Sequence, residues 1–188
     1  VQPSRLQRAK QKASDLLALR PDKRSALVVY AGSAHTVLTL TADQSILNQY
    51  LASLNTDMMP REGKFPEYAL PLVDQVLLDT SAPASVVLLT DGLGADSASA
   101  FADYFAARPH QLLVLGVGTQ SDEPGLVPLE RRNLEDLAAA SSGHYVELTI
   151  DDSDVHKLER LVESHYVVID DDALPWLDSG YPLVFVCI

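Results

Sequence analysis

The sequence predicts an α/β fold in three layers, with helices on both faces of a mostly parallel, doubly wound sheet that has one antiparallel edge strand. Apolar, β-branched runs alternate along the chain with amphipathic segments, a pattern typical of crossover connections between parallel strands. Residues 86–89 are the clearest run, because they are apolar enough for a strand buried on both faces. The run leads into Asp91, at the strand end where open α/β sheets bind their ligands.

The first part of the chain predicts one helix and one antiparallel hairpin. Ser4 can cap the helix, and Gln7 stands where a capping box needs it. Residues 25–31 are largely apolar and predict a second buried strand. Residues 35–40 alternate polar and apolar side chains, as expected for a half-exposed edge strand paired with the strand before it.

The middle of the chain predicts three helices and one long loop. Asp43 can cap a helix that reaches Leu54. Residues 55–65 form the loop, and long loops in compact domains tend to be functional. Pro66 opens a helix that we expect to end at residue 78, and a further helix is expected over residues 96–107.

The last part predicts two more parallel strands and two more helices. We expect strands over residues 112–117 and 144–148, with helices over residues 133–140 and 154–166. The expected domain organisation is one α/β domain over residues 1–166, followed over residues 167–188 by an acidic linker and an apolar segment.

The composition is that of one domain that does not bind nucleic acid. The chain has 188 residues, 47% of them hydrophobic, which is enough for a sizeable core. Its formal net charge is −12, whereas phosphate binding needs a basic surface. Basic residues concentrate in positions 1–24 and acidic residues in positions 147–178. We expect both sets to form solvated faces, with electrostatic docking to a partner as the alternative.

Sequence motifs for catalysis are lacking. Cys187 is the only cysteine, and no histidine pair has the spacing of a zinc-binding helix. The glycines at 116 and 118 have no third glycine opening a helix, as a dinucleotide-binding turn requires. Gly32-Ser33-Ala34 lacks the strand-to-helix elbow of a nucleophilic serine. The sequence therefore favours a protein without enzymatic activity.

Several short motifs follow one another along the chain. They are RSALVVYAGSA at 24–34, LTAD at 40–43, VLLTDG at 87–92 and LGVGT at 115–119, with PSRL at 3–6 and WLDSGY at 176–181 near the two ends. In this order and spacing they resemble the von Willebrand factor type A domain, and within it the bacterial BatB-like proteins of aerotolerance operons. The resemblance covers nearly the whole chain and implies the same fold class, with a central first strand that this sequence lacks.

The resemblance also implies a metal-ion-dependent adhesion site, which is degenerate in this sequence. In the family, an Asp-x-Ser-x-Ser loop after the first strand, a threonine of a Gly-Thr loop and the aspartate of Thr-Asp-Gly hold a divalent cation. Here Lys64 follows Gly63 in place of the threonine, and the sequence begins after the position of the serine loop. Asp91 is thus the residual, weak metal ligand. We expect no cofactor, with Mg²⁺ bound only by a longer form that contains the serine loop.

Two alternatives concern the side chain of Lys64. Its ammonium group either takes the place of the cation beside Asp91 or points to solvent. An exposed ion pair of this kind would contribute about 0–1 kcal/mol.

The position of the missing strand lies between residues 27–30 and 86–89 of the expected sheet. An empty position would leave backbone groups unpaired, at about 1–3 kcal/mol each. An apolar segment that begins at Leu183 and ends at Ile188 could fill it, in its own sheet or in another copy by strand exchange. The alternatives are direct pairing of the two neighbours and a tail docked elsewhere, with the segment as the stub of a membrane helix.

The function that we expect is protein–protein interaction without catalysis. The expected contact surface is the carboxyl edge of the sheet: Gly32, Ser33, Gly63, Lys64, Phe65, Asp91 and Gly92. The resemblance implies an inner-membrane-anchored protein whose domain lies in the periplasm, this part of the chain being soluble and reaching the membrane only through segments outside it. It also implies a role in envelope stress or aerotolerance with a MoxR-type AAA+ ATPase. The alternatives are a small-ligand or nucleotide-using enzyme at the same edge, and a structural remnant without a partner.

Overall fold

A computed structural model describes residues 3–80, 82–118, 129–170 and 182–187 of the chain. Six strands form one sheet in the order β2-β1-β6-β3-β4-β5, and the only antiparallel pair is β1 with β2. The strands are β1 (Ser25–Tyr30), β2 (Ala34–Thr41), β3 (Ser85–Thr90), β4 (Gln111–Gly116), β5 (His144–Glu147) and β6 (Leu183–Cys187). The predicted α/β fold class is confirmed.

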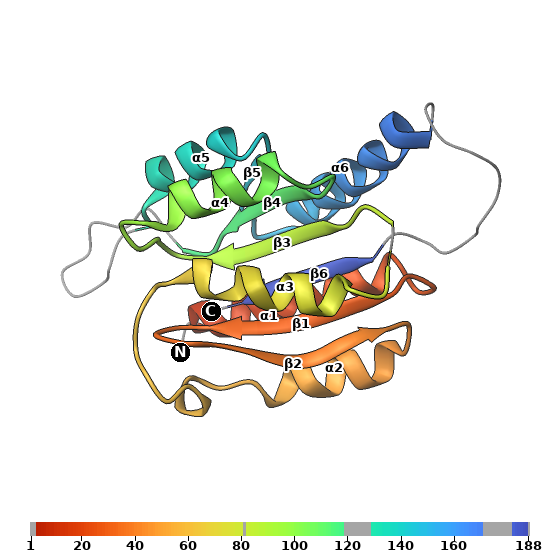
Figure 1. Cartoon of the computed structure of the whole chain (residues 1–188). Helices are drawn as coiled ribbons and strands as arrows, with labels where there is room; N and C mark the ends of the chain where they lie inside the picture. Colours follow the sequence, from red (N-terminus) through yellow and green to blue (C-terminus); the bar gives the residue numbers. More distant parts are fainter. Residues whose placement is uncertain (1–2, 81, 119–128, 171–181, 188) are drawn as a thin grey trace.

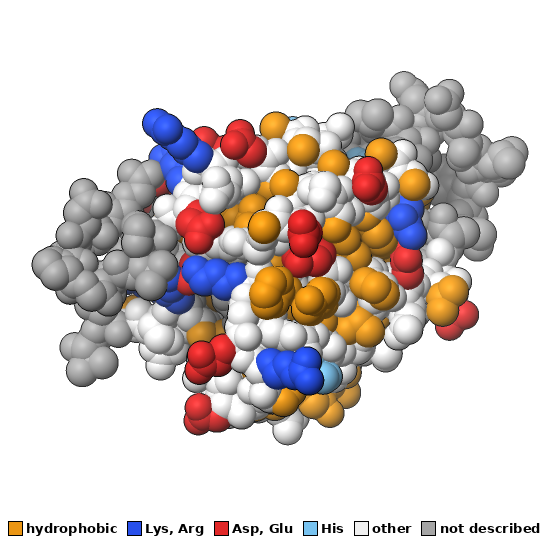
Figure 2. All heavy atoms as spheres, turned by 60° about the vertical axis from the view of Figure 1, so that its left-hand side comes forward, with side chains coloured by type: hydrophobic (Ala, Val, Ile, Leu, Met, Phe, Trp, Pro, Cys, Tyr) orange, Lys and Arg blue, Asp and Glu red, His pale blue; other side chains and the backbone are white. Residues whose placement is uncertain are grey.

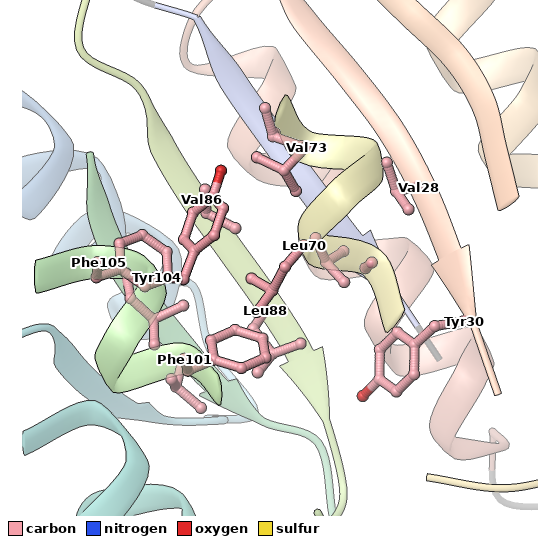
Figure 3. Close-up of a cluster of buried hydrophobic side chains, with 14 of the residues drawn as sticks. Val28, Tyr30, Leu70, Val73, Val86, Leu88, Phe101, Tyr104 and Phe105 are labelled. Atoms are coloured by element: carbon pink, nitrogen blue, oxygen red, sulfur yellow. The ribbon is translucent and has the colours of Figure 1, made fainter. Parts of the chain in front are cut away.

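Six α-helices cover the two faces of this sheet (Figure 1). They are α1 (Arg5–Ala18), α2 (Gln44–Ser53), α3 (Leu70–Leu77), α4 (Ser97–Ala106), α5 (Arg131–Ala140) and α6 (Ser153–Asp170). Helices α3, α4 and α5 pack on one face and share a hydrophobic core with alternate residues of the strands (Figure 3). Helices α1, α2 and α6 form the second core on the opposite face. The sheet is therefore buried on both sides.

The expected helix starts are present at both ends of the β1–β2 hairpin. Ser4 accepts a hydrogen bond from the Gln7 amide and the Gln7 side chain accepts one from the Ser4 amide, which completes the capping box of α1. The carboxylate of Asp43 accepts hydrogen bonds from two amides of α2, those of Ser45 and Ile46. These caps fix where α1 and α2 begin.

Strand β6 occupies the central position between β1 and β3. It runs parallel to both, with Val186 in register with Val28 on one side and Leu88 on the other. Leu183, Phe185 and Cys187 face the α1/α2/α6 core, while Val184 and Val186 face the α3/α4/α5 core. The alternative in which β1 and β3 pair directly is therefore wrong.

Two predicted helix boundaries differ from the structure. The helix expected from Pro66 to residue 78 is a 3₁₀ turn, η2 (Pro66–Ala69), followed by α3. Pro71 stands at the start of α3 and has no amide hydrogen to extend an α-helical ladder backwards, so the tighter turn precedes it. A second 3₁₀ turn, η1 (Thr56–Met58), lies within the predicted loop.

The end of the last helix also differs. The helix continues to Asp170 rather than ending at residue 166. Most of the acidic linker, with Trp176, lies outside the described residues, as do Thr119 and Ile188.

Two charged residues that we expected on solvated faces are buried between helices. The Lys12 ammonium of α1 lies 2.8 Å from the Asp154 carboxylate of α6, and the two side chains are 8% and 0% exposed. The second carboxylate oxygen of Asp154 accepts a hydrogen bond from the Thr149 amide. The prediction of solvated faces is wrong for this pair, which connects α1 to α6 within the second core.

Candidate functional site

The predicted contact residues come together at the carboxyl edge of the sheet. The turn after β1 is bound to the loop that precedes η2 by two backbone hydrogen bonds: the Gly32 amide donates to the Arg61 carbonyl at 2.9 Å, and the Phe65 amide donates to the Ala31 carbonyl at 3.3 Å. The end of β3 completes the edge, because Lys64 of the same loop reaches Asp91. Segments distant in the sequence thus form one surface.

Close backbone approach explains two of the glycines at this edge. A Cβ atom at Gly32 would lie 2.4 Å from the Glu62 carbonyl oxygen, and one at Gly92 would lie 2.7 Å from Oε1 of Glu130 and 3.0 Å from Nζ of Lys64. The first obstacle is backbone and cannot move aside cheaply. Only a residue without a side chain lets the two loops meet as they do.

Asp91 is held by two cations. Nζ of Lys64 lies 3.1 Å from Oδ1, and a guanidinium nitrogen of Arg5 donates to Oδ2. The Asp91 side chain is only 10% exposed, whereas those of Lys64 and Arg5 are 32% and 29% exposed. The Lys64 ammonium thus lies beside Asp91, and the pair is less exposed than we expected.

Arg5 and Glu130 are members of the site that the sequence did not predict. Arg5 is the first residue of α1, where a cation opposes the helix dipole, and this placement is the one sequence signal that Arg5 has a carboxylate partner. Glu130 precedes α5, its amide donates to the Asp91 carbonyl at 3.3 Å, and its carboxylate lies 4.0 Å from Nζ of Lys64. Two basic and two acidic residues therefore form the charged centre of the edge.

The side chains nearest this centre are poor nucleophiles. Tyr30 is fully buried, and burial, with the nearby Asp91 carboxylate, raises the pKa of its phenol far above the ordinary value. Burial also raises the pKa of the Cys187 thiol to about 12. Both groups stay protonated at neutral pH, so neither is activated for attack.

Ser33 lies apart from Asp91. Its hydroxyl is 3.0 Å from Nε2 of His35 on the exposed hairpin turn. Within the described ranges no carboxylate orients this imidazole through a hydrogen bond, as a nucleophilic serine would require. Ser33 therefore contributes a polar group to the rim of the edge.

The residues at Asp91 do not fit a divalent metal ion. Magnesium needs several oxygen ligands in near-octahedral geometry, but ammonium and guanidinium groups contact both carboxylate oxygens of Asp91. In the part of the chain that the structure describes, no three histidine, cysteine, aspartate or glutamate side chains are grouped to hold a metal. Lys64 and Arg5 supply the positive charge at this carboxylate.

The unequal burial of these charges predicts an unequal response to mutation. Replacing both Arg5 and Lys64 with alanine leaves a buried carboxylate uncompensated, and we expect a loss of about 3 kcal/mol in the free energy of unfolding. Asp91→Asn leaves two cations that water can reach, and we expect a loss below about 1 kcal/mol. Urea unfolding followed by circular dichroism measures both. The control is Arg132→Ala with Lys157→Ala, two exposed bases; an equal loss in all three variants would contradict this description of the site.

Comparison with known proteins identifies the fold around this site. Residues 1–93 match the family model of the von Willebrand factor type A domain. The chain carries a von Willebrand factor type A domain. This confirms the resemblance seen in the sequence. No match was found among curated proteins.

The von Willebrand factor type A fold extends over nearly the whole chain. The crystal structure of the conserved hypothetical protein BatB from Bacteroides thetaiotaomicron has a TM-score of 0.76 and 20% identity, covering 89% of this chain and 91% of that one. An aerotolerance-related membrane protein from Bacteroides fragilis also has a TM-score of 0.76, with 22% identity and coverage of 87% and 90%. At this identity the likeness shows a shared fold. In the described residues, each helix is too short or too polar to span a bilayer.

Proposed function

We propose that this von Willebrand factor type A domain is a non-enzymatic protein-interaction module of a BatB-like membrane-anchored protein. Its contact surface is the carboxyl edge defined by Gly32, Ser33, Gly63, Lys64, Phe65, Asp91 and Gly92. The observation that carries the proposal is the buried Asp91 carboxylate held by Lys64 and Arg5. A partner meets a neutralised, preformed surface there rather than a metal ion.

Exposed aromatic side chains beside the charged centre support this proposal. Phe65 and Tyr68 are 37% and 49% exposed, and their rings stack with centroids 5.3 Å apart. Figure 2 shows hydrophobic side chains gathered in the middle of this side of the molecule, with acidic and basic side chains around them. Aromatic residues are enriched in protein interfaces, where a polar rim surrounds an apolar centre.

The cellular context of the proposal comes from the similar proteins. One is named BatB and another is described as an aerotolerance-related membrane protein. We accordingly propose a periplasmic domain with a role in aerotolerance or envelope stress, and a MoxR-type AAA+ ATPase as a functional partner. Because Lys64 and Arg5 take the place of a cation, the interaction should not require divalent metal.

The test is a pull-down with the full chain as bait, from a lysate of the source organism and with its purified MoxR-type ATPase. Phe65→Ala, Lys64→Ala and Asp91→Ala should each reduce the captured protein, while EDTA should have no effect. Leu78→Ala is the matched control, since Leu78 is 76% exposed and lies on α3's carboxyl-terminal side, away from this edge. Equal capture by all variants, capture that EDTA abolishes, or turnover of a small substrate would contradict the proposal.

A further inference from the structure

A cavity of about 430 Å³ opens next to the carboxyl edge. Its walls come from the start of α1, the ends of β1 and β2 that meet at the hairpin, and the loop between α2 and η2. The apolar lining consists of Leu6, Val29, Val37, Leu54, Met58 and Met59. The volume falls in the range of about 300–1,000 Å³ that is usual for ligand pockets.

The pocket is accessible and adjoins the proposed contact surface. Met58 at its mouth is 53% exposed, whereas Leu54 and Val29 in its wall are 6% and 9% exposed. Gly63 belongs both to the pocket and to the contact surface, and the Gly32 amide is bonded to Arg61, another pocket residue. Methionine side chains are unbranched and adapt to apolar groups of different shape. A partner that covers the edge therefore reaches this pocket as well.

Charge at the mouth of the pocket restricts the partner. The exposed residues Asp57 and Glu62 stand there with one base, Arg61. In the part of the chain that the structure covers, neither acid forms an ion pair. The whole chain carries a formal charge of −12, so a second copy or an acidic segment is repelled and a basic segment is attracted.

We infer that the partner inserts an apolar side chain, flanked by basic residues, into the pocket lined by Leu6, Val29, Val37, Leu54, Met58 and Met59. The inference rests on the proposed function, because it names the chemistry of the segment that binds beside the carboxyl edge. The apolar side chain displaces water from the pocket, and the basic flanks pair with Asp57 and Glu62 at its mouth.

The test uses three synthetic peptides and the full chain labelled with ¹³C at its methyl groups. The first peptide carries a leucine and a phenylalanine between lysines, the second replaces the lysines with glutamates, and the third replaces the leucine and phenylalanine with alanines. We expect saturable shifts of the Val29, Val37, Leu54 and Met58 methyl resonances with the first peptide only. The affinity should fall at raised ionic strength, because exposed charges are screened.

Variants assign these shifts to the pocket. Met58→Gln, which keeps the length of an exposed side chain, should weaken the first peptide about tenfold, equivalent to about 1.4 kcal/mol. Asp57→Asn with Glu62→Gln should also weaken it, while the control Leu78→Gln should not. Equal binding of the second or third peptide, or no methyl shift with the first, would overturn the inference.

The outcomes also separate this inference from the proposed function. If captured partners depend on Lys64 and Phe65 but not on Met58, the contact surface stands and the pocket inference fails. If the first peptide binds the pocket while Lys64→Ala and Phe65→Ala capture as much protein as the wild type, the pocket inference stands and the proposed surface fails.

Discussion

Replacing Val186 with aspartate should leave the chain without a cooperative folded state. Val186 is 1% exposed in the central strand, between Val28 and Leu88 of its two neighbours. A carboxylate at this position would have no partner in the α3/α4/α5 core. The cost exceeds about 4–5 kcal/mol, which is comparable with the total stability of about 5–15 kcal/mol of an ordinary domain.

The position of β6 makes this effect larger than in an edge strand. Strand β6 is the only connection between the β2–β1 pair and the β3–β4–β5 group, because β1 and β3 each pair with β6 and not with each other. Its loss would separate the sheet into two parts and leave backbone groups of both neighbours unpaired. Urea unfolding followed by far-ultraviolet circular dichroism and by fluorescence measures the effect.

A matched substitution separates burial from added charge. Ile150→Asp places the same side chain at an apolar residue that is fully exposed, and we expect its unfolding transition to coincide with that of the wild type. If Val186→Asp unfolds as cooperatively as Ile150→Asp and at the same urea concentration, then β6 does not hold the sheet together.

Lys12→Met should cost about 3–5 kcal/mol in the free energy of unfolding, the loss expected when one partner of a buried ion pair is removed. The Asp154 carboxylate would remain fully buried. It would keep the hydrogen bond from the Thr149 amide but lose its only cation among the described residues. The carbonyl of Asp151 would also lose the Lys12 ammonium as a donor.

A second substitution should recover much of this loss. Lys12→Met with Asp154→Asn removes the unpaired charge while an amide oxygen can still accept from Thr149, so the double variant should be more stable than Lys12→Met alone. Lys157→Met is the control, because Lys157 is an exposed lysine of α6. Equal stability of Lys12→Met and Lys157→Met would show that the buried pair contributes nothing measurable.

Local patterns in the sequence were sufficient for most of the fold. The apolar runs became β1, β3, β4 and β6, and the alternating residues 35–40 lie in the edge strand β2. A strand buried on both faces needs apolar side chains at every position, and this is why the segment from Leu183 could be matched to the centre of the sheet. The early end of η2 was missed because it depends on Pro71 within an otherwise helical pattern.

The site was less predictable because its charges come from distant parts of the sequence. Lys64 and Asp91 could be paired through the family resemblance, which places their two loops at one edge. Arg5 and Asp91 are 86 residues apart, and Lys12 and Asp154 are 142 apart. Both bases lie on α1 among other basic residues, and no local pattern distinguishes a buried lysine or arginine from a solvated one.

The most direct test of a metal-independent edge is a titration of the ¹⁵N-labelled full chain with Mn²⁺, whose unpaired electrons broaden nearby amide resonances. With Lys64 and Arg5 on the Asp91 carboxylate, the amides of Thr90, Asp91 and Gly92 should show no selective broadening at about 1 mM Mn²⁺, above the range in which well-formed divalent sites are occupied. Selective, saturable broadening of these three amides that Asp91→Asn abolishes would contradict this account, because it would show that a divalent ion displaces the two cations.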